Sequence, residues 1–199
     1  MTTTFYLVRH AAHDNVGGFL AGRMPGVRLG VDGLAQAARL GQRMTRERFD
    51  AIYASPRERT QETAQAIVAA RAPMPVETAP ELDEVDFGDW SGNGWDVLNA
   101  DPRWRNWNTM RSMARTAGGE SMLDVQLRVL ALMERLREQF PDGRVVLVSH
   151  ADIIKTVVSY VLGLPIDSWP RLEISPASIT TVVMGEWGGK LHTLNEVTD

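Results

Sequence analysis

The sequence predicts a three-layer α/β/α fold built on a mainly parallel, mixed sheet. Apolar runs alternate with stretches whose apolar residues keep helical spacing, which is typical of parallel strands covered by helices on both faces. Two expected strands, 4–9 and 144–149, have continuously apolar centres, as buried strands do. The chain has 199 residues, of which 44% are hydrophobic and 23% charged, and this favours one domain over residues 1–199.

The first elements follow one another closely. The strand over 4–9 leads into a glycine-rich loop over 11–31. Asp32 is expected to cap a helix whose apolar residues recur with helical spacing as far as Met44. A second short strand is expected over 50–54. Alternation of strand and helix favours parallel pairing of these strands.

The second helix has a strong start signal. Ser55 is expected as its N-cap, Pro56 as its first residue and Glu58 as the partner in a capping box. The helix should extend to about Ala70. Three prolines make the following stretch, 72–80, extended or irregular.

Residues 93–117 interrupt the alternation. Glycines mark turns around 88–94, and the segment then ends at the pair Gly118 and Gly119. Three tryptophans lie among four arginines here, namely Trp95, Trp104 and Trp107 with Arg103, Arg105, Arg111 and Arg115. We expect an inserted lid of short helices that packs mainly on itself.

The last part of the chain restores the alternation. Ser121 and Asp124 form a predicted capping box, and Gly163 gives the stop signal of a later helix. The expected elements are a helix over 122–139, a strand over 144–149, a helix over 152–162 and two strands over 178–184 and 190–195, joined by a turn at 186–189.

Composition excludes several classes of function. The net charge of −4 argues against a nucleic-acid partner or an anionic membrane, because both require a basic surface. The chain has no cysteine, so disulfides and thiol catalysis are impossible. No apolar run reaches membrane-spanning length, and residues 1–4 lack a basic leader, which favours a cytoplasmic protein. The tryptophans could serve a homodimer as easily as a lid.

Chemistry-bearing residues follow the two apolar strands. Arg9 and His10 come at the end of the first strand, and His150 comes directly after the second. In open α/β sheets, ligands collect outside the carboxyl ends of such strands. Arg59, close to the positive end of its helix, adds a second guanidinium suited to binding phosphate. The pattern predicts a phosphate pocket.

The same residues predict a reaction. A neutral, oriented imidazole can attack phosphorus, and the leaving oxygen of an ester then needs a proton from an acid. The segment 82–88 holds Asp83, Glu84 and Asp86 as candidate acids, of which the two aspartates fit loop or capping roles better. His10 and His13 lack a third ligand at suitable spacing, so neither a metal nor another cofactor is expected.

Five blocks, in this order along the chain, resemble the histidine phosphatase superfamily, the phosphoglycerate mutase-like group of branch 1. They are Leu7-Val8-Arg9-His10, Ser55 to Ala64, Leu82-Asp83-Glu84 with Asp86 to Gly92, Gly118-Gly119-Glu120-Ser121, and Val148-Ser149-His150-Ala151. The resemblance implies that His10 becomes the phosphohistidine. It implies that Arg9, Arg59 and His150 hold the phosphate, and that Glu84 acts first as acid and then as base.

The resemblance also indicates a substrate loop and some departures from the family. Leu20-Ala21-Gly22-Arg23 is similar to that loop, so Gly22 and Arg23, with Asn15 and Ala151, are candidate substrate-binding residues. Ala11 stands where the family has glycine, and Ala12-His13 replaces its Glu/Gln-Thr pair. The family's pocket asparagine would fall at Val16, one position after Asn15.

The sequence therefore predicts a phosphomonoesterase that acts on a small phosphorylated metabolite. A phosphoglycerate-type phosphomutase and a non-catalytic phosphate-binding protein are the alternatives. Family mutases carry an adjacent arginine pair and a proline run in a longer insertion, and residues 93–117 have neither. A serine hydrolase is excluded because no Gly-x-Ser-x-Gly elbow occurs.

Overall fold

One six-stranded mixed sheet organises the molecule. The computed structural model describes residues 1–14 and 17–198. The strand order is β3-β2-β4-β1-β5-β6; β1, β2, β3 and β4 are parallel, whereas β5 and β6 run antiparallel at one edge. The strands are β1 (Thr2–Arg9), β2 (Ala51–Ala54), β3 (Val76–Thr78), β4 (Arg144–Ser149), β5 (Ile179–Gly185) and β6 (Gly188–Glu196).

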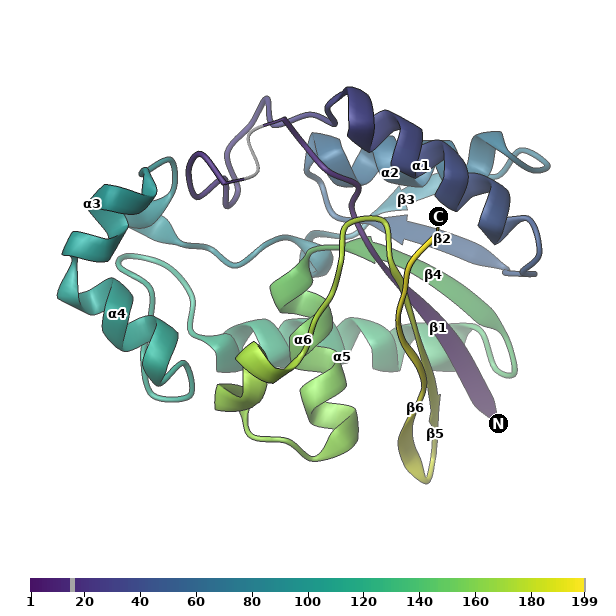
Figure 1. The fold of residues 1–199 in the computed structure, drawn as a ribbon. Helices are drawn as coiled ribbons and strands as arrows, with labels where there is room; N and C mark the ends of the chain where they lie inside the picture. The colour runs from purple at the N-terminus through teal and green to yellow at the C-terminus, as the bar shows by residue number, and fades with distance from the viewer. Residues whose placement is uncertain (15–16, 199) are drawn as a thin grey trace.

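Helices cover both faces of the sheet, so the predicted three-layer α/β/α fold is confirmed (Figure 1). Apolar residues of α1 and α2 form one core with one face of the sheet, while α5 and α6 form a second core with the other face. Burial on both faces explains why the centres of β1 and β4 are continuously apolar. These helices are α1 (Val31–Met44), α2 (Glu58–Ala69), α5 (Met122–Gln139) and α6 (Ala151–Leu162).

The expected insertion contains two short helices, α3 (Trp95–Ala100) and α4 (Pro102–Thr109), which lie beyond one end of the sheet (Figure 1). Trp107 is fully buried and packs its ring against Phe87, Trp90 and Arg111. The aromatic contacts to Phe87 and Trp90 join the insertion to the segment between β3 and α3. The insertion is thus packed against the rest of the molecule as well as on itself.

Two expected helix starts are wrong. The N-cap of α1 is Gly30, and Asp32 lies one residue inside the helix. Helix α2 begins at Glu58 after Arg57, so Ser55 does not cap it and no capping box forms there. Neither α1 nor α2 has a side-chain hydrogen bond at its N-cap. The Ser55 hydroxyl bonds to the side chains of His150 and Asp83 instead. By contrast, the capping box of Ser121 and Asp124 at the start of α5 is confirmed.

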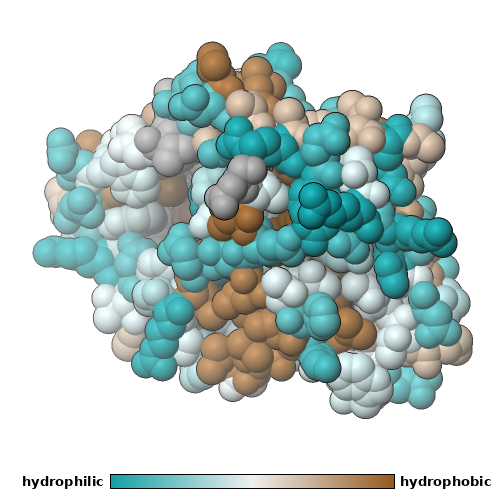
Figure 2. All heavy atoms as spheres, turned by 45° about the vertical axis from the view of Figure 1, so that its right-hand side comes forward, coloured by the Kyte–Doolittle hydropathy of each residue, from teal (hydrophilic) through white to brown (hydrophobic). Residues whose placement is uncertain are grey.

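On the face shown in Figure 2, hydrophilic residues run across the middle, a group of hydrophobic residues lies below the centre, and further hydrophobic residues lie at the upper edge. Exposed apolar side chains occur on α6 and on the β5-β6 turn, including Tyr160, Leu162 and Trp187. The homodimer stays a prediction. Among the described residues, no helix combines the length and the apolar character needed to cross a bilayer.

Candidate active site

Three parallel strands deliver three polar residues to one edge of the sheet. His10 follows β1, Ser55 follows β2 and His150 follows β4. The strand ladder continues one step further, because the amide of His10 donates to the carbonyl of Ser149 (2.9 Å) and the amide of Ser55 donates to that of Val148 (3.0 Å). All three residues are buried. Sheet pairing therefore brings together residues that lie far apart in the sequence.

The two imidazoles face each other. Their ring centroids are 5.2 Å apart and the rings meet edge to face. Nδ1 of His10 lies 2.8 Å from the carbonyl oxygen of Ala11, which can only accept, so this nitrogen carries the proton. Nε2 of His10 then keeps its lone pair, and Nε of Arg59 donates toward it at 3.4 Å.

His150 is oriented by a relay of two side chains. Its Nε2 lies 2.9 Å from the hydroxyl of Ser55, and that hydroxyl donates to Oδ1 of the buried Asp83 at 3.2 Å. On the other side of the ring, Nη2 of Arg59 lies 3.2 Å from Nδ1. These partners favour a ring protonated on Nε2, with Nδ1 as the acceptor.

Both rings are held in the neutral form. Burial lowers the pKa of His10 well below its ordinary value, and the charges of Arg59 and Arg9 lower it further. Burial and Arg59 act in the same way on the pKa of His150. A neutral ring keeps a lone pair, so His10 has nucleophilic character at neutral pH.

Two guanidinium groups line the site. Arg59 lies in the first turn of α2, is almost completely buried, and donates from Nη2 to the carbonyl of Gly22 at 2.8 Å. Arg9 ends β1 and donates from Nη1 to the carbonyl of Ile174 at 2.6 Å. Within the described residues, Nη1 of Arg59 and Nε of Arg9 are buried donors with no hydrogen-bond partner. A phosphate group would satisfy such donors with charge-assisted hydrogen bonds.

Glu84 supplies an acid at the same place. Its Oε2 lies 3.6 Å from Nδ1 of His150, and its Oε1 accepts from the amide of Val85 at 2.9 Å. Burial, together with the negative charge of Asp152, raises its pKa to about 7. A carboxyl with this pKa is partly protonated at neutral pH and suits general acid–base chemistry.

The predicted substrate-binding residues do not all lie beside the two histidines. Gly22 adjoins the site through its bond to Arg59, and Ala151 begins α6 directly after His150. Arg23 contacts the segment that holds Glu84 rather than the strand ends, with Nε donating to the carbonyl of Glu84 at 2.7 Å. Asn15 lies outside the described residues. The substrate-binding role of all four stays a prediction.

Sequence reasoning missed two partners in the site. Ser55 was expected as the N-cap of the second helix, yet it and Arg57 both precede α2 and contact Asp83; Nε of Arg57 is 3.0 Å from Oδ1. Nη1 of Arg57 also donates to the carbonyl of Arg23. The end of the apolar run over 50–54 was the available signal for Ser55, since it marks a strand end just as the runs before His10 and His150 do.

Two further residues near the site are Asp152 and His13. His150 is the N-cap of α6, and Asp152, two residues further on, forms an ion pair with the buried Arg111 of the insertion (3.0 Å). The ring of His13 lies 5.9 Å from that of His10, centroid to centroid. Over residues 1–14 and 17–198, no group of three or more metal-ligating side chains is present.

The fold and the site define an α/β protein with a cationic, two-histidine site at the carboxyl ends of its parallel strands. The chain belongs to the histidine phosphatase superfamily (branch 1), whose family model matches residues 5–197. The expected resemblance is thereby confirmed.

Similar proteins come from several bacteria. An uncharacterized protein of Mycobacterium tuberculosis is 33% identical, and the match covers 91% of this chain and 90% of that protein. Phosphoserine phosphatase 1 of Hydrogenobacter thermophilus is 31% identical, with 82% and 78% covered. Among solved structures, the native mycobacterial glucosyl-3-phosphoglycerate phosphatase superposes with a TM-score of 0.87 at 26% identity, over 98% of this chain and all of that one.

Proposed function

We propose that this protein is a phosphomonoesterase that hydrolyses a small phosphorylated metabolite through a phosphohistidine on His10. The observation that carries the proposal is the contact of one buried guanidinium, that of Arg59, with both neutral imidazoles at the strand ends. Relatives that bear the names of phosphatases for small phosphate esters support the same class of reaction.

The first step transfers the phosphoryl group to the protein. The free donors of Arg9 and Arg59 bind the oxygens of the phosphate dianion, and Nε2 of His10 attacks phosphorus with its lone pair. The dianion favours protonation of His150, whose Nδ1 can then donate to a phosphoryl oxygen. As the ester P–O bond breaks, protonated Glu84 gives its proton to the departing alkoxide, which leaves as a neutral alcohol.

The second step returns the protein to its starting state. Glu84, now a carboxylate, accepts a proton from a water molecule, and the oxygen of that water attacks phosphorus. The N–P bond breaks, its electron pair returns to Nε2 of His10, and orthophosphate leaves. Glu84 ends the cycle protonated, and a raised pKa close to neutrality suits this alternation between acid and base.

The experiment replaces the nucleophile and looks for its adduct. His10→Ala should lower the turnover of p-nitrophenyl phosphate by about 10⁴- to 10⁶-fold, as the loss of a catalytic nucleophile does. The wild-type protein, quenched during turnover, should carry an acid-labile phosphoryl group at residue 10. His192→Ala is the control, because that histidine lies on β6, away from the strand ends.

Two outcomes would overturn the proposal. Full activity of His10→Ala would exclude His10 as the nucleophile. Interconversion of 3-phosphoglycerate and 2-phosphoglycerate that depends on 2,3-bisphosphoglycerate and exceeds phosphate release would identify a mutase. A panel of phosphate esters that contains phosphoserine, sugar phosphates and nucleotide-pathway phosphates would then define the preferred substrate of a hydrolase.

A further inference from the structure

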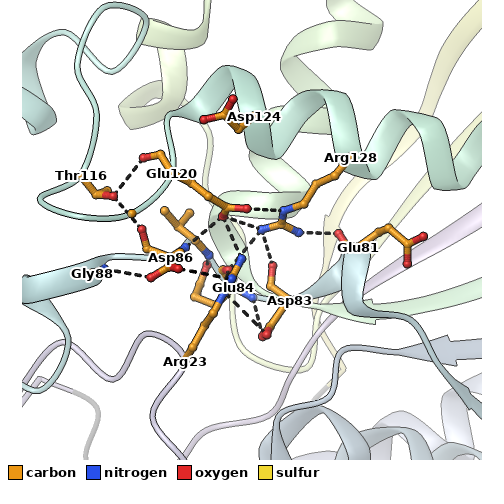
Figure 3. Close-up of polar contacts among 12 residues, drawn as sticks. Arg23, Glu81, Asp83, Glu84, Asp86, Gly88, Thr116, Glu120, Asp124 and Arg128 are labelled. Carbon is orange, nitrogen blue, oxygen red and sulfur yellow. Dashed lines mark hydrogen bonds and ion pairs between the residues drawn. The ribbon is translucent and has the colours of Figure 1, made fainter.

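Two arginines from opposite sides hold the backbone that bears Glu84. Arg128 of α5 donates to the carbonyls of Asp83 (2.8 Å) and Glu84 (3.1 Å), and Nε of Arg23 donates to the carbonyl of Glu84 at 2.7 Å. Arg128 also bonds to the carbonyl of Glu81. Figure 3 shows the two guanidinium groups meeting over this segment, Arg128 from the helix and Arg23 from the loop. The acid-bearing chain lacks regular structure here, so these bonds fix its position.

Glu120 joins the two arginines. One of its carboxylate oxygens accepts from Arg23 (2.8 Å) and the other from Arg128 (3.0 Å). Burial raises the pKa of Glu120, but the hydrogen bonds from Arg128 and from the amide of Asp86, with the charges of Arg128 and Arg23, together outweigh burial and lower it overall. Glu120 is therefore the ionised counterion of both guanidinium groups. We call Arg23, Glu120 and Arg128 the arginine clamp.

The Gly118-Gly119-Glu120-Ser121 block acquires a physical role from this contact. The amide of Glu120 donates to the carbonyl of Asp86 (3.0 Å), and the amide of Asp86 donates back to the carboxylate of Glu120 (3.0 Å). A Cβ on Gly119 would lie 2.0 Å from the Asp86 carbonyl oxygen, so only glycine permits this approach. The block thus presents Glu120 to the two arginines at close range.

The clamp also touches the phosphate side of the site. The carbonyl of Gly22 accepts from Arg59, and the next residue, Arg23, donates to the carbonyl of Glu84. One dipeptide of the loop therefore contacts both the phosphate-binding guanidinium and the chain that bears the acid. Displacement of Arg23 would change the distance between these two groups.

We infer that Arg23, Glu120 and Arg128 are positioning residues that hold Glu84 where it can protonate the leaving oxygen. The inference rests on the proposed function, since it assigns Glu84 the role of acid. None of the three side chains has to touch the reacting atoms. A displacement of about 1 Å in a catalytic group can cost on the order of a hundredfold in rate.

The test separates positioning from stability by the nature of the leaving group. p-Nitrophenolate leaves readily without a proton, whereas an alkoxide does not. Arg128→Met should lower kcat/KM, which reports the steps up to departure of the leaving group, about 10- to 100-fold on glycerol phosphate and about threefold or less on p-nitrophenyl phosphate. The inhibition constant of orthophosphate should stay unchanged, because Arg9 and Arg59 keep their places. A merely structural role would reduce both activities equally.

Controls make each result decisive. Arg135→Met removes an exposed arginine of the same helix that pairs with the side chain of Glu81, and it should leave the ratio of the two activities unchanged. Arg128→Lys keeps the charge without the planar fork and should behave like Arg128→Met. If Arg128→Met fails to fold, Arg23→Gln provides the same comparison from the loop side.

Three results would overturn the inference about the clamp. The first is an equal loss of activity on both substrates, and the second is no loss of activity in either the Arg128 or the Arg23 variant. The third is full activity of Arg128→Lys. Failure of the proposed function would look different, because His10→Ala would then stay active on p-nitrophenyl phosphate. The two ideas can therefore fail separately.

Discussion

The phosphate-binding and acid-bearing parts of the site are positioned by different means. His10 and Ser55 extend the ladder of the paired strands through backbone hydrogen bonds to β4, and His150 follows β4 directly. Glu84 lies between two short 3-10 helices, and its backbone is held by side chains that arrive from a loop and from α5.

This difference affects how each part should respond to substitution. A strand end is fixed by a cooperative ladder with two cores around it, so changing one side chain leaves the backbone in place. The acid-bearing segment depends on a few side chain–backbone bonds, and each one carries a larger share of its order. We expect remote substitutions to alter acid catalysis more readily than phosphate binding.

The largest effect that distinguishes the two parts should come from Glu84→Gln. The amide keeps the size of the side chain but has no acidic proton, so kcat/KM on an alkyl phosphate should fall about 10²- to 10⁴-fold. This ratio reports the steps up to departure of the leaving group, so the later role of Glu84 as base does not affect it. Orthophosphate binding, measured by competitive inhibition, should change little because Arg9 and Arg59 are untouched. An equal fall on p-nitrophenyl phosphate would contradict a role in leaving-group protonation.

A smaller effect is expected from Gly119→Ala, which disturbs the acid side through the backbone. The new Cβ would lie 2.0 Å from the carbonyl oxygen of Asp86, so the two chain segments must separate. Overpacking of this kind costs about 1–3 kcal/mol in the free energy of unfolding. Urea denaturation measures this loss, and the alkyl phosphate activity of the folded protein should fall as well.

Gly94→Ala is the matched control for Gly119→Ala. The nearest atom to a Cβ at residue 94 is 3.9 Å away, and that glycine has an ordinary negative φ. Its change in stability should stay within about 1 kcal/mol, the scale of an N-cap substitution. If both variants lost the same stability, the close approach of Gly119 to Asp86 would not be what holds the segment.

The difference between the strand ends and the acid-bearing segment also explains which parts of the site the sequence could predict. Apolar runs predict β1 and β4, and their register places His10 beside His150, so the strand-end histidines and Arg59 could be found from local pattern. Arg23 and Arg128 bond to a carbonyl that lies 61 and 44 positions away. A side chain–backbone bond requires no particular residue at the accepting position, so one sequence carries no signal for it.

Local signals also failed where a tertiary contact competed with them. Ser55, Pro56 and Glu58 have the pattern of a capping box, yet the Ser55 hydroxyl bonds to His150 and Asp83. Burial of His150 makes an unpartnered ring nitrogen costly, on the order of 1–3 kcal/mol, which is comparable to or greater than the gain from a helix cap. Helix α2 therefore begins three residues after Ser55, at Glu58.

The smallest predicted effect is the pH dependence, which tests whether both parts have the required protonation states. Activity needs His10 neutral and Glu84 protonated. The pKa of His10 is held well below 6.5 by burial and by Arg59 and Arg9, so the acid limb should lie below that value. The pKa of Glu84 is about 7, raised by burial and by Asp152 against the opposing charges of Arg59 and Arg9.

The rate constant kcat/KM should therefore fall as pH rises through about 7, by about tenfold for each further unit. Ionisation of the substrate phosphate contributes its own limb, so the profile is compared with that of Glu84→Gln on the same ester. The limb near pH 7 should vanish in the variant while that of the substrate persists. A wild-type limb that survives in Glu84→Gln would assign the titration near pH 7 to a group other than Glu84.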